Sequence, residues 1–113
     1  MKKLLLAILL LAVLPAPAQD KPLKARITVV DENDNIVPGA TVTLFKTHED
    51  YKKETNPVVS AVTNEKGFVE FKKLQELSYF VLVEKGDLNN NGGYNQIPQL
   101  RTKGKNRFVI QID

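Results

Sequence analysis

The sequence DENDNIVPGATVTLF (residues 31–45) decides the fold, because it passes directly from turn-forming residues into a strand pattern. The DENDN segment is dense in Asp and Asn, whose side chains hydrogen-bond nearby backbone and tolerate left-handed conformations. Pro38 and Gly39 then mark a second turn or a bulge. After them, apolar residues alternate with the residues of the opposite face, as expected of a half-buried strand. The inward face of that strand is predicted to carry Ala40, Val42 and Leu44.

Five further segments have strand character, and turn or loop signals separate them. They are residues 24–30, 58–63, 68–71, 78–85 and 105–113. Residues 47–57 read as a loop or a short helical turn, 72–77 as a linker, and 86–104 as a long polar loop. The sequence therefore predicts one all-β domain, a small antiparallel Greek-key sandwich of six to seven strands.

The N-terminus has the features of a secretory signal peptide. Lys2 and Lys3 precede an apolar run over residues 4–14, and Ala16-Pro17-Ala18 is a small-x-small cleavage site. The apolar run is shorter than the roughly 20 residues that span a bilayer, which favours cleavage over an uncleaved anchor. We predict a signal peptide over 1–18 and a domain over 19–113.

The composition limits the classes of function. The sequence contains no Cys, which excludes thiol catalysis, thiolate metal sites and an anchor through a lipid-modified cysteine. Removing Lys2 and Lys3 with the leader leaves 14 basic and 13 acidic residues, so nucleic-acid binding is not expected. We expect an exported protein, periplasmic or at the cell surface, that does not span a membrane once the signal peptide is removed.

Two segments resemble the carboxypeptidase regulatory-like domain, a member of the transthyretin-like (prealbumin-like) sandwich family. The first, VVDENDNIVPGATVTLF, departs from the family pattern at Asp34, where Gly is usual, and at Ile36, where Pro is usual. In the second, Leu77 replaces a Gly. The matching residues are Val29, Asp31, Val37, Pro38, Gly39, Ala40, Val42 and Leu44, and then Thr63, Asn64, Gly67, Val69, Phe71, Leu74 and Tyr79. The resemblance covers residues 27–83 and implies a non-catalytic module.

Candidate catalytic groups are few, and we expect no enzyme activity. His48 is the only histidine and lies in a charged loop, whereas transthyretin-like hydroxyisourate hydrolases need several. Ser60 and Ser78 lie in strand patterns rather than at a nucleophile elbow. A Lys24–Asn106 isopeptide bond, as in collagen-adhesin B-type repeats, would need a buried carboxylate and a buried lysine, and Lys24 is predicted to face outward.

No cofactor is expected, and calcium is the one metal that the sequence suggests. Asp87, Asn89 and Asn91 occupy alternate positions of DLNNNGG, as at the start of an EF-hand-type loop. Pro98 stands where such a loop needs a bidentate Glu. Asn-Gly-Gly sequences are also common in simple turns.

Two surfaces are candidates for binding. Phe45, Phe80 and Leu82 are predicted to point outward from paired strands, which favours a scaffold module that contacts an envelope or extracellular protein. The alternative is that the 47–57 or 86–104 loop covers them. The outward residues of the first and last strands form a predicted basic face, which would bind a glycan or polyanion. The alternative is an ordinary solvated strand face whose charges discourage aggregation. This face comprises Lys24, Arg26, Lys105 and Arg107.

Overall fold

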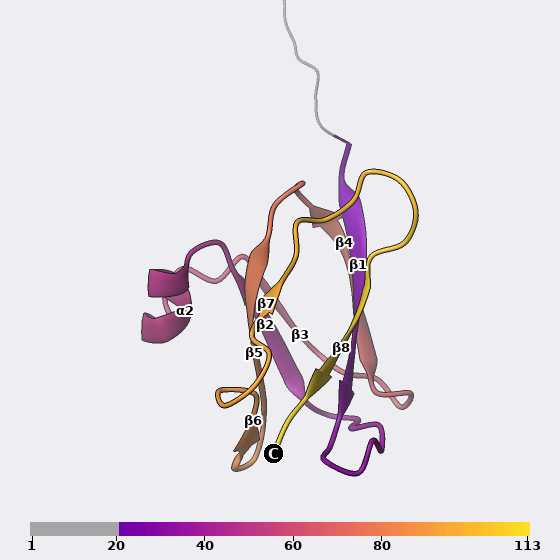
Figure 1. Cartoon of the computed structure of the whole chain (residues 1–113), viewed down its shortest axis with the longest axis vertical. Coiled ribbons are helices and arrows are strands. Elements are labelled where there is room, and N and C mark those ends of the chain that lie inside the picture. The colour runs from indigo at the N-terminus through magenta and orange to yellow at the C-terminus, as the bar shows by residue number, and fades with distance from the viewer. Residues whose placement is uncertain (1–20) are drawn as a thin grey trace, which may run out of the picture.

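The computed structural model describes residues 21–113, and the predicted signal peptide lies outside them. Two β-sheets pack face to face (Figure 1). One sheet has the strand order β4-β1-β8. The other has the order β3-β2-β5-β6, and β7 also pairs with β5. The prediction of a small all-β sandwich is therefore confirmed.

Within residues 21–113 the strands follow the sequence pattern closely, and one helix interrupts them. The elements are β1 (Leu23–Val30), β2 (Thr41–Phe45), α2 (His48–Lys53), β3 (Val59–Val62), β4 (Phe68–Leu74), β5 (Tyr79–Lys85), β6 (Leu88–Asn89), β7 (Gln96–Ile97) and β8 (Arg107–Gln111). Burying one face of each sheet leaves alternate side chains inside, which is why strand periodicity predicted the core. The fully enclosed residues include Ile27, Val29, Val42, Leu44, Val81, Val83, Ile110 and Ile112.

The structure corrects the predicted elements in four places. Strand β4 continues through residues 72–74, where a linker was expected, and residues 48–53 form a helix. The predicted 86–104 loop contains the two-residue strands β6 and β7. Finally, β8 runs parallel to β1, whereas all other pairs are antiparallel, so the sandwich is not purely antiparallel.

At the corner between β1 and β2, a side-chain hydroxyl forms hydrogen bonds to backbone groups that have no strand partner. Asp34, at the position where the resembled family has Gly, adopts a left-handed conformation with φ of 65°. The hydroxyl of Thr63 accepts a hydrogen bond from the Ala40 amide (2.9 Å) and donates one to the Val37 carbonyl (2.7 Å). Thr63 is buried, so these bonds fasten the Pro-Gly corner to the end of β3.

Asn90 supplies hydrogen bonds to β5 in the gap between β6 and β7. Its side-chain oxygen accepts from the Val83 amide (2.9 Å), and its amide nitrogen donates to the Val81 and Tyr94 carbonyls (2.9 and 3.1 Å). The residue is 1% exposed. Because a buried backbone group without a partner is costly, this one side chain lets the long loop lie against β5.

Gly67 should not tolerate a side chain. Its φ is +81°, and an added Cβ would lie 2.7 Å from the Ile36 Cβ. We predict that Gly67→Ala lowers the free energy of unfolding by at least about 1–2 kcal/mol, since an L residue is strained in this conformation. Urea denaturation measures it. Gly92→Ala is the matched control, because nothing lies within 4 Å of its added Cβ; equal stability losses in the two variants would contradict the account.

Asp31 makes folding stability depend on pH in the acid range. Hydrogen bonds from the backbone amides of Asn35 and Asn33 hold the pKa of its carboxyl below the ordinary 3.8. A depressed folded-state pKa contributes stability that is present above about pH 4 and is lost as pH falls through the folded-state pKa. We predict that Asp31→Asn flattens the acid limb of unfolding free energy against pH. The control is Glu32→Gln, which also removes one exposed carboxylate. An acid limb that Asp31→Asn leaves unaltered, or that both variants flatten equally, would contradict this.

Candidate functional site

The expected aromatic interaction surface is covered, which corrects the prediction that Phe45, Phe80 and Leu82 form an exposed patch. Phe45 and Leu82 are buried beneath α2, and Phe80 is half-buried against them. Tyr51 of the helix packs edge-on against Phe45, with ring centroids 6.1 Å apart. The alternative, in which the chain's own loops cover these side chains, is the one that the structure supports.

The helix that covers this cluster is capped at both ends and bonded to the long loop. At its C-terminus the Glu54 amide donates to the Asp50 and Tyr51 carbonyls. The Thr47 hydroxyl caps its first turn by accepting from the Asp50 amide (3.0 Å). The Tyr51 hydroxyl donates to the Asn91 side-chain oxygen (3.1 Å) and accepts from the Asn95 side-chain nitrogen (3.3 Å). These bonds join residues 47–54 to the 86–104 segment, so both loops contribute to covering the apolar surface.

The three residues suggested for calcium do not converge on one point: two use their side-chain oxygens in hydrogen bonds within the protein, and the third is exposed. The Asn91 side-chain oxygen accepts from Tyr51, and that of Asn89 accepts from the Asn91 amide (2.9 Å). Asp87 is exposed in the turn after β5. Within residues 21–113, no group of three or more His, Asp and Glu side chains is arranged to hold a metal ion.

The residues considered for covalent chemistry are also dispersed. His48 stacks edge-on with Phe80, at 5.3 Å between ring centroids. Lys24 is exposed, and only its backbone carbonyl contacts the Asn106 amide (3.1 Å). The buried lysine that an isopeptide bond needs is absent at this position, because Ala25 is the inward residue of β1 here.

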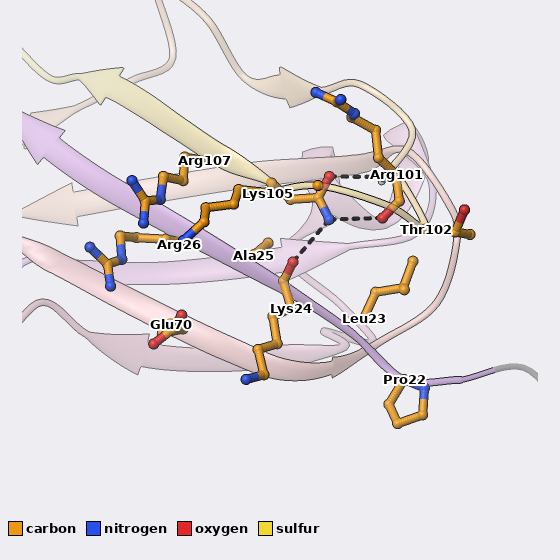
Figure 2. A pocket seen from close by; sticks show the side chains of 12 residues that line it. Pro22, Leu23, Lys24, Ala25, Arg26, Glu70, Arg101, Thr102, Lys105 and Arg107 are labelled. Carbon is orange, nitrogen blue, oxygen red and sulfur yellow. Dashed lines mark hydrogen bonds between the residues drawn. The ribbon is translucent and has the colours of Figure 1, made fainter.

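The basic residues of β1 and β8 surround one hollow of about 350 Å³, which we call the basic hollow. It lies where the start of β1 meets the start of β8 and the 101–106 loop (Figure 2). Its lining includes all four residues of the predicted basic face, together with Arg101 and a single carboxylate. The charged lining residues are Lys24, Arg26, Arg101, Lys105, Arg107 and Glu70.

The side chain of Asn106 holds the loop in place. Its oxygen accepts from the Arg101 amide (2.8 Å), and its nitrogen donates to the Arg101 and Lys24 carbonyls (3.1 Å each) (Figure 2). The loop is also anchored at Leu100, which is buried in the core. The loop is thus attached on both sides of Arg101, and the backbone that carries this arginine is fixed beside β1.

Strand register brings two arginines together in the basic hollow. Arg26 lies directly opposite Arg107 across the parallel β1–β8 pair, and opposite Glu70 across the antiparallel β1–β4 pair. Figure 2 shows the two arginine side chains extending side by side. The Arg26 guanidinium lies over the Phe68 ring, 4.1 Å from its centroid, and its buried Nε has no hydrogen-bond partner among the described residues.

Positive charge in the basic hollow is not balanced by the fold. The ion pair that the structure holds within residues 21–113 joins Lys53 to Glu49, on α2 and away from the hollow. Like charges directly opposite one another on neighbouring strands are destabilising. The Arg26–Arg107 pair is therefore unfavourable, and an anionic ligand that contacts both guanidinium groups would offset its repulsion.

Next to the arginines, the same sheet face is apolar. Thr28 of β1 lies opposite Phe68 on one side and Val109 on the other. Val109 is 62% exposed, whereas Thr28 and Phe68 are half-buried. The outer face of this sheet therefore presents a charged row followed by an uncharged row.

The comparisons with known proteins show the fold and nothing finer. No protein-family model matches the chain, and no curated protein matches it. Among solved structures, the Bacillus anthracis TIE protein is similar, with a TM-score of 0.58 and 21% sequence identity. The match covers 80% of this chain and 16% of that protein, so this chain spans a small part of its length. None of the helices in residues 21–113 has the length and apolar character needed to cross a bilayer.

The Asn106 side chain should contribute more to the free energy of unfolding than an exposed side chain of the same polar segment. We predict that Asn106→Ala lowers the free energy of unfolding by about 1–3 kcal/mol, because buried backbone groups lose their partners. Amide hydrogen exchange at Arg101 should also accelerate. Gln99→Ala is the control, since its side chain bonds only to the exposed Glu76 (3.2 Å). An Asn106→Ala protein as stable as Gln99→Ala would contradict the assignment.

Proposed function

We propose that this protein is an exported, non-catalytic binding module that captures an acidic polysaccharide on the outer face of the β4-β1-β8 sheet. The observation that carries the proposal is the basic hollow, where five cations meet one carboxylate and no ion pair. Phe45, Phe80 and Leu82 do not offer a surface for binding another protein, because they pack with Tyr51 in a cluster that α2 covers.

A solvated strand face with protective charges accounts less well for this arrangement. Charges that discourage aggregation are expected on edge strands. Arg26 lies on β1, which is the middle strand of its sheet, and its side chain is half-buried over Phe68. Protection of a sheet edge therefore does not explain why Arg26 lies in the basic hollow.

The ligand chemistry follows from the two rows of the sheet face. Planar guanidinium groups match carboxylates geometrically and bind them through paired hydrogen bonds. In the adjacent row, Phe68 is half-buried beneath the Arg26 guanidinium and Val109 is exposed, so Val109 offers the apolar surface against which a sugar ring can lie. A polymer that alternates ring faces with carboxylates uses both rows, whereas an anion without rings uses only the first.

The test is binding of polygalacturonate, measured by calorimetry at two salt concentrations. We predict that Arg26→Gln combined with Arg107→Gln weakens binding about tenfold or more, since charged hydrogen bonds are lost, and that added salt weakens wild-type binding. The control is Lys46→Gln with Lys52→Gln, which removes the same charge from exposed positions outside the hollow. Neutral dextran should not bind.

Three results would overturn the proposal. The first is equal losses in the two double variants, which would show that net charge alone matters. The second is binding that does not respond to salt. The third is tighter binding of polyphosphate or DNA than of polygalacturonate, which would assign the hollow to another class of polyanion.

A further inference from the structure

Strand β3 leaves an open edge on the five-stranded sheet. It is the last strand in the order β3-β2-β5-β6, and β2 is its one neighbour in that sheet. Ser60, Ala61 and Val62 are all exposed, although their side chains alternate between the two faces. Both the amide and the carbonyl of Thr63 bond toward β2, so the antiparallel alternation directs the backbone groups of Ser60 and Val62 to the open side.

This edge lacks the features by which sheet edges usually avoid pairing. The sequence of β3 is VSAV, without charge or proline, and its register with β2 has no bulge. Other edges in the described structure are protected differently: β4 exposes Glu70, Lys72 and Lys73, β8 carries Arg107, and β6 has two residues. An unprotected edge with exposed valines is a template for another strand. Val62 is 58% exposed, and Val58, directly before β3, is 38% exposed.

We infer that two copies of this chain pair through β3, antiparallel and around a twofold axis at Ala61. In this register Ser60 lies opposite Val62 of the partner subunit, and the outward backbone groups form about four hydrogen bonds. Ala61 meets its own copy at a closely spaced position, where a small side chain allows the strands to approach. Neither Val59 nor Val58 meets a charged residue, since their counterparts are Thr63 and Asn64 of the partner subunit.

The inferred register also places a turn of the partner subunit at an existing hollow. Between β3 and β4 lies a hollow of about 420 Å³, lined by the apolar residues Val58, Val59, Phe71 and Leu74 and by the charged residues Glu70, Lys72 and Lys73. A twofold axis normal to the sheet keeps both small sheets on the same side. The 64–67 turn of each copy, which crosses from one sheet to the other, then lies against the hollow of the other copy.

The second contact brings together charged side chains of both signs. The crossing turn carries Glu65 and Lys66, which are exposed and form no ion pair in residues 21–113. The hollow that it approaches is lined by Lys72, Lys73 and Glu70. A second copy therefore meets the edge with matched backbone groups, and each of the two charges on its turn finds a group of opposite sign in the hollow.

A cysteine introduced at the twofold axis tests the register directly. The chain has no Cys, so Ala61→Cys adds a single thiol, and a closely spaced antiparallel pair suits a disulfide. Under mild oxidation at micromolar concentration we expect Ala61→Cys to become a covalent dimer at least tenfold faster than Val109→Cys. Val109 is the control because it is exposed on the other sheet. Equal rates would overturn the inference.

Sedimentation of the unmodified protein gives an independent readout. We expect a concentration-dependent dimer, and Ala61→Lys should raise its dissociation constant at least tenfold by placing two like charges at the axis. Because Ala61 is exposed, this variant should keep its circular dichroism spectrum. A native protein that stays monomeric to hundreds of micromolar, or an Ala61→Lys dimer of unchanged strength, would overturn the inference. Neither result bears on polysaccharide binding by the opposite sheet.

Discussion

The candidate site depends on the amide of Asn106, which attaches the loop before β8 to the start of β1. Its three hydrogen bonds reach Lys24 on one side and Arg101 on the other. The Asn106 carbonyl also accepts from the Arg26 amide (2.8 Å), so β1 and β8 begin their parallel register here. That register places Arg26 opposite Arg107, and the basic hollow follows from it.

The two sheets have separate tasks in this account. The larger sheet is covered over part of its outer face by α2, and this cover makes its aromatic residues a second core cluster. The smaller sheet carries the basic hollow and the uncharged row on its outer face. Pairing through β3, on the larger sheet, would leave the outer face of the smaller sheet free. The dimer would then carry two binding faces, which strengthens attachment to a polymer through effective concentration.

Strand periodicity predicted the sandwich core and the outward direction of the basic residues, because alternation is a local property of the chain. It did not predict what covers Phe45 and Leu82. That outcome depends on Tyr51 reaching Asn91 and Asn95, which lie 40 and 44 residues away. Likewise, the pattern placed Asn90 in a polar loop and Asn106 in the last strand without indicating their hydrogen bonds, since a side chain that replaces backbone pairing has no periodic signature. A buried polar residue is recognisable only from its partners.

The most direct test of the central claim is a nitrogen-15 NMR titration with polygalacturonate oligomers at physiological salt. The account predicts that the largest shift changes fall on the amides of Arg26, Arg107, Asn106 and Val109, on the outer face of the small sheet. Residues of α2 should change little. Changes centred on α2 or the 86–97 segment, or no changes at millimolar oligomer, would contradict the assignment of the binding face.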